Sequence, residues 1–320
     1  MKKLSVVFIC LIASVAMLLG LLIFTISMTA NGWDFSKLSS SNTLERSYEC
    51  EEKITDVSIF LDTEDITILP SSDGKTKFVF KESESLKHTV SCDGGKASIS
   101  VEDTRKWYNY IFNFTETSLT LYLPEGSYSS LIINADTSDV EIAKDFNFDF
   151  IDISLSTGDV VSRASASVST KIKVSTGRIN LSDAKTGELN LTSSTGDMTL
   201  SNIEADDVAI KVSTGDVEIR NTSLKSLITL GSTGELKMSG VVASGKWSIE
   251  RSTGDLEFEA CDAMEIYILT DTGEVTGTLL SEKIFIVKTD TGDINVPRTA
   301  TGGICEIITD TGDIEIYIKN

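Results

Sequence analysis

Histidine is almost absent from this sequence, and basic residues are scarce relative to acidic ones. His88 is the only histidine in 320 residues. One imidazole can build neither a histidine-based catalytic triad nor a histidine-rich metal site, so we expect His88 to be a surface or cap residue. The 28 basic and 48 acidic residues leave a formal net charge of −20. Such a surface repels phosphate backbones, which argues against nucleic acid as a partner.

Charge is also missing from one long segment near the N-terminus. No residue from Leu4 to Ala30 is charged, and this run exceeds the roughly 20 apolar residues that cross a bilayer core. A cleaved signal peptide has a shorter apolar region, of about 7 to 15 residues. We therefore predict an uncleaved signal anchor, a single transmembrane helix over residues 1–30. Lys2 and Lys3 place its N-terminus in the cytoplasm and the rest of the chain outside the cell membrane.

Five cysteines are present, and the predicted extracytoplasmic part contains four of them. Cys10 lies in the predicted span and has no lipobox before it. Cys50 and Cys92 could form a disulfide in an oxidising compartment, although their spacing alone does not decide this. Cys261 and Cys305 are far apart along the chain, and we interpret both as small buried apolar residues.

A repeat of 19 to 20 residues dominates the chain after residue 130. Each copy is marked by Thr-Gly, and the marker threonines are Thr157, Thr176, Thr195, Thr214, Thr233, Thr253, Thr272, Thr291 and Thr311. Apolar residues alternate on both sides of each marker, as in Val208, Ile210 and Val212 before it and Val217 and Ile219 after it. Alternation around a glycine turn is typical of two half-buried strands. The repeat predicts an all-β, single-stranded β-solenoid over residues 131–320, in which each coil is a strand, a tight turn, a strand and a polar return.

Two irregularities interrupt this pattern. Thr63 lies in the same phase as the markers, although Glu64 replaces the glycine, so the first coil begins there and residues 51–130 hold that coil plus an irregular β cap. Residues 31–50 are then a linker. Between Leu227 and Gly231 the apolar residues move one place, and we predict that Gly231 forms a bulge that restores the register.

The chain resembles a known family at these residues. The segment IFLDTEDITIL at 59–69, the segment LYLPEG at 121–126 and the serial STGD or DTGD turns are similar to the bacterial "putative adhesin" family of β-strand-repeat domains of unknown function, which includes LiaG-like membrane-anchored envelope proteins. The resemblance covers roughly residues 50–320. It implies a β-solenoid at the cell envelope, with a role in adhesion or envelope stress, and it supplies no catalytic residues.

Acidic residues recur beside the turns, and three successive copies carry them in pairs. Stacked carboxylates repel one another, and a hard cation such as Ca²⁺ would relieve that repulsion. The alternative is that the aspartates cap the turns and are solvated. The candidate Ca²⁺ ligands are Asp271, Glu274, Asp290, Asp293, Asp310 and Asp313.

Two further features are candidate contact surfaces. An aromatic run could form an adhesive loop or fill the cap; its members are Trp107, Tyr108, Tyr110, Phe112 and Phe114. The segment from Ile316 to Asn320 follows a strand with no capping segment, so its free edge could accept a strand from a partner or a second copy unless Lys319 blocks it.

These patterns favour a non-enzymatic function without a cofactor, because coils of uniform length leave no loops to wall an active site. The first hypothesis is an interaction module that presents a rigid surface to an envelope protein, a cell-wall polymer or another cell. The second is an envelope-stress sensor that acts through a membrane partner. The third is a rod that self-assembles with Ca²⁺ through its open last coil.

Overall fold

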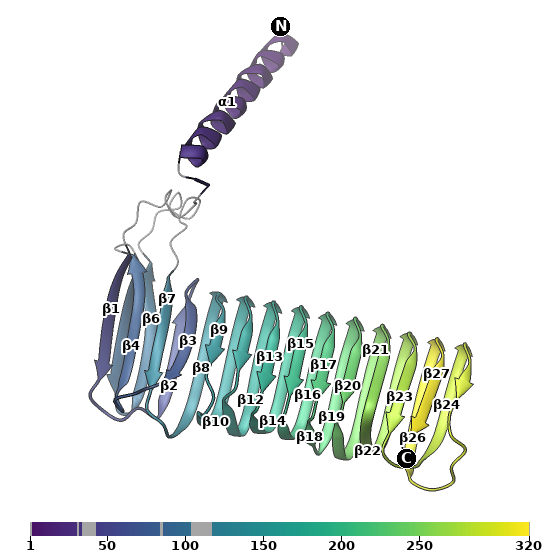
Figure 1. The fold of residues 1–320 in the computed structure, drawn as a ribbon. Coiled ribbons are helices and arrows are strands. Elements are labelled where there is room, and N and C mark those ends of the chain that lie inside the picture. Colours follow the sequence, from purple (N-terminus) through teal and green to yellow (C-terminus); the bar gives the residue numbers. More distant parts are fainter. Residues whose placement is uncertain (1, 31, 34–42, 84–85, 104–116, 320) are drawn as a thin grey trace.

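The computed structural model describes residues 2–30, 32–33, 43–83, 86–103 and 117–319. Helix α1 (Lys2–Ala30) is followed by an all-β rod, as Figure 1 shows. The segment Leu11–Ala30 of α1 is long and apolar enough to cross a membrane. The rod is a β-solenoid with coils of about 20 residues, as the repeat predicts.

Each coil contributes one strand to each of two long sheets, here called sheet A and sheet B. In order from the N-terminal cap, sheet A contains β1 (Thr43–Cys50), β4 (Thr76–Ser83), β7 (Ser118–Leu123), β3 (Asp65–Pro70), β9 (Val140–Ile142), β11 (Val160–Ser162), β13 (Ile179–Ser182), β15 (Met198–Ser201), β17 (Val217–Arg220), β20 (Leu236–Ser239), the first part of β22 (Leu256–Thr272), β23 (Val275–Leu279), β27 (Ile314–Ile318) and β25 (Ile294–Asn295).

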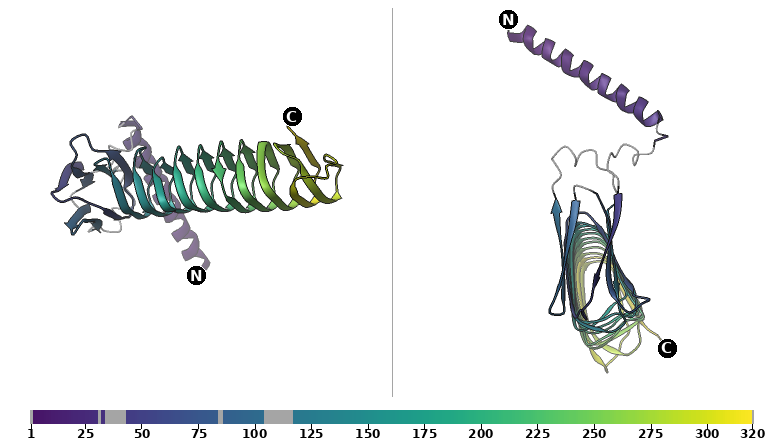
Figure 2. Two further views of the ribbon diagram at one scale, coloured as in Figure 1. Left: turned by 90° about the horizontal axis from the view of Figure 1, so that it is seen from below. Right: turned by 90° about the vertical axis from the view of Figure 1, so that its left-hand side faces the viewer.

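Sheet B follows the same order. It contains β5 (Leu86–Asp93), β6 (Lys96–Asp103), β2 (Asp56–Leu61), β8 (Ser127–Thr137), β10 (Asn147–Thr157), β12 (Ser165–Thr176), β14 (Lys185–Thr195), β16 (Glu204–Thr214), β18 (Ser223–Leu224) with β19 (Ser226–Thr233), β21 (Val242–Thr253), the second part of β22, β26 (Gly303–Thr311) and β24 (Lys283–Thr291). Figure 2 shows the resulting rod from below and end-on.

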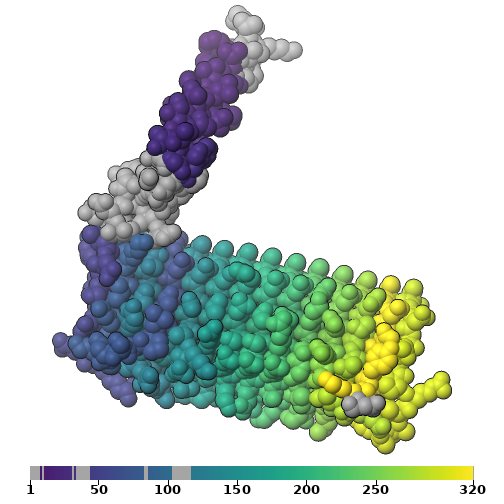
Figure 3. Space-filling model, viewed as in Figure 1, coloured from purple at the N-terminus to yellow at the C-terminus, as the bar shows by residue number. Residues whose placement is uncertain are grey.

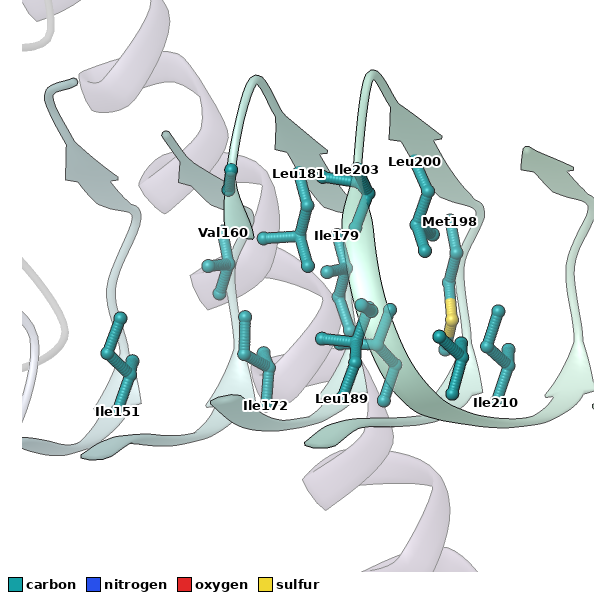
Figure 4. Packing of buried hydrophobic residues seen from close by; sticks show 14 of the residues in the cluster. Ile151, Val160, Ile172, Ile179, Leu181, Leu189, Met198, Leu200, Ile203 and Ile210 are labelled. Atoms are coloured by element: carbon teal, nitrogen blue, oxygen red, sulfur yellow. The ribbon is translucent and has the colours of Figure 1, made fainter. Parts of the chain in front are cut away.

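The core lies between the sheets and is filled by the alternating apolar positions. Ile172, Leu191 and Ile210 pair in register on neighbouring strands of sheet B, and each is buried. They face residues of sheet A such as Ile179 and Met198, which are also buried (Figure 4). Burying one such side chain stabilises the fold by about 1.5–3 kcal/mol. Because every coil adds the same set, the core continues along the rod.

The turn glycines are required for two reasons. Gly177 has φ +147°, a conformation that disfavours residues with a Cβ atom. In addition, a Cβ atom on Gly177 would overlap the carbonyl oxygen of Gly158 in the neighbouring coil. The same overlap recurs at Gly196, Gly215 and Gly234. The conformation is predictable from the sequence, whereas the close stacking of turn on turn is visible only in the structure.

Where the sequence predicts a polar return, the chain makes a second corner and then continues as a strand. Asp183, Asn202 and Asn221 adopt positive φ at this corner and stack on one another. The Nδ2 of Asn202 donates a 2.9 Å hydrogen bond to Oδ1 of Asp183. Asparagine and aspartate tolerate this conformation better than other residues with a Cβ atom, which explains why they occur there.

The predicted bulge at Gly231 is wrong. Val212, Gly231 and Arg251 pair in continuous register, so Gly231 occupies an ordinary inward position. Its missing side chain makes room for Arg251, whose guanidinium group would overlap a Cβ atom on Gly231. Ile228 and Leu230 therefore point outward and are exposed.

The cap extends both sheets at the N-terminal end of the rod. The coil at Thr63 stacks directly on the regular coils, because β2 pairs with β8 and β3 pairs with β9. Strands β6 and β7 of the cap pair in parallel with β2 and β3, and the strands outside them run antiparallel to their neighbours. Residues 43–50, assigned above to the linker, form β1, since they pair along their whole length with β4. A disulfide between Cys50 and Cys92 joins the outermost strands of the two sheets.

The last two coils are stacked in the reverse of their chain order. Strand β26 lies between β22 and β24, and β27 lies between β23 and β25. Gly302 and Gly303 allow this insertion, because Cβ atoms there would overlap the carbonyl oxygens of Glu282 and Met264 in the coils on either side. The predicted free edge at Ile316–Asn320 lies one level inside the end of the rod, on the yellow β27 (Figure 1). Strand β25 covers only Ile314 and Glu315 of β27, and Ile316–Ile318 pair with β23 alone among the described strands, while Asn320 lies outside the described residues.

Candidate functional site

The acidic turn edge is a ladder of hydrogen bonds. The carboxylate of one turn accepts a bond from the backbone N–H of the equivalent residue in the next coil. The N–H of Asp216 donates to Oδ1 of Asp197 at 2.9 Å, and the N–H of Glu235 donates to Oδ1 of Asp216 at 2.8 Å. Hydrogen bonds to an ionised acceptor are stronger than neutral ones. The turn aspartate therefore has a structural role in the coils where a further coil donates to it, at Asp139, Asp159, Asp197, Asp216, Asp255 and Asp313.

Arg178 is the exception in this row, and it is paired. Its guanidinium group contacts the carboxylate of Asp159 at 2.6 Å, and its own N–H donates to the same side chain at 2.8 Å. The hydrogen bonds and charge of Arg178 hold the pKa of Asp159 below its usual value. This pair neutralises one step of the acidic ladder.

The six predicted Ca²⁺ ligands lie on the three coils at the C-terminal end of the rod. In the order of stacking they form the pairs Asp271 with Glu274, Asp310 with Asp313, and Asp290 with Asp293. Oδ1 of Asp313 accepts a 2.8 Å bond from the N–H of Asp293, and Lys288 pairs with Asp290 at 2.7 Å. Within the described ranges, no group of three or more His, Cys, Asp or Glu side chains is arranged to hold a metal ion.

The predicted aromatic contact surface cannot be placed. Trp107, Tyr108, Tyr110, Phe112 and Phe114 all fall within residues 104–116, outside the described part of the chain. Their role as a contact surface stays a prediction.

The cap contains a cluster of buried charges that the sequence did not reveal. His88 is buried between Glu64 and Glu82: its Nδ1 lies 2.8 Å from Glu82 Oε2, and its Nε2 lies 3.4 Å from Glu64 Oε1. Arg46 contacts the other oxygen of Glu82 at 2.8 Å. The ring of Phe80 stacks on the imidazole, with centroids 4.3 Å apart.

The environment shifts two groups of this cluster. Burial lowers the pKa of His88, but the hydrogen bonds and charges of Glu64 and Glu82 outweigh burial and raise it overall. Burial raises the pKa of Glu64, but the hydrogen bond and charge of His88, with backbone N–H donors, lower it overall. His88 therefore lies in the cap, which was one of its two predicted positions, and it is buried. The missing glycine at Glu64 was the available signal, because that carboxylate accepts bonds from the N–H groups of its own turn.

The remaining cysteines behave as predicted. Cys261 and Cys305 are free and buried. Burial raises the pKa of Cys305 to about 12. A thiol with so high a pKa is a poor nucleophile, because the thiolate is the reactive form.

On the face of the rod seen in Figure 3, the side chains form closely packed rows. A depression of about 520 Å³ lies where β6 separates from β2, and its lining includes Phe60, Asp136 and Lys173. Its polar lining consists of serines, Asp62, Asp136, Asn134 and Lys173, without histidine or cysteine.

The family follows from a match over most of the rod. The model of the Toastrack DUF4097 family matches residues 54–257, which span the first coil, the cap insert and the regular coils as far as the start of β22. This chain belongs to the toastrack family. The match confirms the resemblance drawn from the LYLPEG segment and the serial turns. No curated protein matches this toastrack chain.

Two solved structures are similar to this chain. A structure titled as a "putative adhesin" from Parabacteroides distasonis ATCC 8503 is 11% identical, with a TM-score of 0.50, and the alignment covers 87% of this toastrack chain and 98% of that chain. A "putative adhesin" from Bacteroides fragilis NCTC 9343 is 14% identical over the same shares, with a TM-score of 0.44. At these identities the likeness concerns the fold alone.

The open end of the toastrack rod, opposite the cap, is a further candidate contact surface. It is formed by β24 and β25, which pair only with β26 and β27 among the described strands. Phe285 and Val287 occupy inward positions of β24 but are only half-buried, because no further coil covers them. Ile284 and Ile286 on the outer face of the same strand are exposed. Four consecutive apolar residues at 284–287 were the sequence signal for this end.

Proposed function

We propose that this protein is a membrane-anchored, non-enzymatic interaction module that acts outside the cytoplasm. In this proposal α1 is a signal anchor, and the solenoid presents its faces to a protein or polymer of the cell envelope or of another cell. The observation that carries the proposal is the joining of an apolar helix to a rod whose outward positions repeat from coil to coil.

The repeated outward positions form a regular surface. The residue before each marker threonine is an exposed serine on consecutive coils, and these residues are Ser156, Ser175, Ser194, Ser213, Ser232 and Ser252. Adjacent coils are spaced by about 4.8 Å, the distance between paired strands. Regularly spaced hydroxyl and carboxylate groups suit a partner with many weak contacts, such as a linear envelope polymer.

The test uses the full chain in liposomes. Protease added outside the vesicles should digest the solenoid when it is exposed, which establishes its orientation. Vesicles carrying the protein should then sediment with isolated cell-wall polymer, or bind solubilised envelope proteins, at least ten-fold more than empty vesicles. Equal sedimentation of loaded and empty vesicles with every fraction would contradict the proposal.

The sensing hypothesis predicts a different result for one variant. If α1 only anchors the rod, its replacement by an unrelated transmembrane helix should leave binding unchanged. A sensor that signals through a partner helix should lose its response with the same replacement, although external binding persists.

Calcium binding by the acidic pairs stays part of the proposal as an open prediction. Isothermal titration of Ca²⁺ into the full chain, compared with the Asp290→Asn/Asp310→Asn variant, would test it. Heat of binding that is present in the wild type and lost in the variant supports a site; no heat up to millimolar Ca²⁺ contradicts one.

A further inference from the structure

The open end of the rod exposes both a sheet edge and the end of the core. Strand β24 has nine residues, and its outer edge has no partner strand among the described residues. Unpaired backbone groups on a long apolar edge are a ready template for another strand. Phe285, Val287 and Val296 pack against the core but are partly exposed. The end therefore lacks the cover that every other coil receives from its neighbour.

The opposite end of the rod is closed by different residues. The outermost strands there, β1 and β5, carry charged residues, including Glu45, Glu49 and Lys87. The disulfide between Cys50 and Cys92 links these two strands across the core. Charged edge strands discourage pairing with another chain. Pairing of the open end of one rod with the capped end of the next is thus disfavoured. Pairing of two open ends is not disfavoured in this way.

The open end carries no net formal charge. The chain as a whole has a formal net charge of −20. The terminal coil, residues 283–296, contains Lys283, Lys288, Asp290 and Asp293, so its charges cancel. Two copies that approach side by side repel each other, because each carries a large net negative charge. Two copies that approach through these neutral ends repel each other much less.

From these observations we infer that the open end is an interface for a second copy of this chain, arranged end to end about a two-fold axis. The terminal coil presents an edge in sheet B (β24) and an edge in sheet A (β25) at the same level, with the core between them. A second copy offers two edges with the same separation. Antiparallel pairing of β24 with its equivalent keeps inward residues opposite inward residues, so Phe285 and Val287 of both copies join in one core.

This inference deepens the proposed interaction role by naming one partner, and it can fail independently. A rod that stays monomeric would overturn it and would leave the binding of envelope components, measured on vesicles, untouched.

The test is sedimentation equilibrium of the full chain in density-matched detergent over a range of protein concentrations. The end variant is Ile284→Lys/Ile286→Lys, at residues that are 41% and 52% exposed. The matched control is Ile228→Lys/Leu230→Lys, at residues that are 47% and 38% exposed on the outer face of β19 in the middle of the rod. We expect a wild-type dimer, a dissociation constant at least ten-fold higher for the end variant, and no change for the control.

Two results would overturn the inference. One is a wild type that is monomeric at every concentration. The other is an end variant that dimerises as tightly as the wild type, which would place the contact elsewhere, for example in α1. Hydrogen exchange gives a second readout that needs no substitution: backbone amides of residues 284–291 should exchange more slowly as the protein concentration rises, and unchanged exchange in a dimeric sample would also overturn the inference.

Discussion

Nζ of Lys283 lies 2.6 Å from Oδ1 of Asp262, and this ion pair joins the outermost coil to the coil two levels inside it. The pair passes the intervening coil at Gly303, which has no side chain to block it. The side chain of Lys283 is only 3% exposed. The reversed order of the last two coils is therefore held by a buried charge pair as well as by strand pairing.

Loss of Asp262 should loosen the open end. Asp262→Ala leaves the Lys283 ammonium group buried without a carboxylate, and removing one partner of a buried pair costs about 3–5 kcal/mol. Asp262 is partly exposed, so we expect about 2 kcal/mol, felt mainly in β24 and β25 because stability in a solenoid is local. Hydrogen exchange of residues 284–295 should accelerate at least about ten-fold.

The control for this variant is Asp206→Ala, which removes the partner of the exposed Lys225. We expect the hydrogen exchange of residues around Asp206 and Lys225 to stay unchanged, because exposed ion pairs contribute little to stability. Equal exchange of residues 284–295 in wild type and Asp262→Ala would show that strand pairing alone holds the terminal coil.

A turn glycine should not tolerate alanine. Gly215 has φ +148°, and a Cβ atom there would overlap the carbonyl oxygen of Gly196. The backbone conformation alone costs about 1–2 kcal/mol, and the overlap adds to it. Gly215→Ala should lower the thermal unfolding midpoint clearly, while Ser213→Ala, at an exposed position two residues away, should change it little. Similar midpoints for both variants would contradict the close stacking of the turns.

Gly231 and Arg251 should be energetically coupled. Gly231→Val forces a side chain into the space of the Arg251 guanidinium group, and overpacking costs about 1–3 kcal/mol. Adding Arg251→Val gives the row the same residue as Val212, so the double variant should be more stable than the sum of the single effects by about 0.5–3 kcal/mol. Chemical denaturation of all four proteins measures this coupling, and strictly additive effects would contradict the contact.

The cap should respond to pH through His88 and Glu64. The pKa of His88 is raised, so its contribution to stability is complete below about 6.5 and is lost as pH rises through the folded-state value. The pKa of Glu64 is lowered, so its contribution is present above the ordinary value of 4.5 and is lost as pH falls through the folded-state value. The cap should therefore be most stable between about pH 4.5 and pH 6.5.

Thermal unfolding of the wild type and of His88→Phe between pH 5 and pH 9 tests this expectation. Phenylalanine keeps the contact with Phe80 but cannot titrate, so the loss of stability on the alkaline side should disappear. The exposed neighbour gives a control, since Lys87→Met should keep the wild-type profile. An alkaline limb that persists in His88→Phe would assign the pH dependence to other groups.

The sequence by itself determined the repeat and therefore the fold class. The period of 19 to 20 residues, the glycine turns and the alternation around them, as at Ile210 and Ile219, specify which residues face inward, because strand side chains alternate with period two. The apolar run of α1 was equally clear, since it depends on composition and length alone. The positions of Cys261 and Cys305 followed from the same periodicity.

The tertiary structure alone decided which coils are neighbours at the two ends. Parallel strands with the same apolar pattern can pair in more than one order, so periodicity could not show that β26 lies inside β24. Glu64 belongs to the first coil, whereas Glu82 and His88 belong to the cap insert. The three side chains meet because the insert stacks on the first coil and then adds antiparallel strands outside it. The end of the rod thus depends on contacts between residues far apart in the chain, which local sequence patterns do not encode.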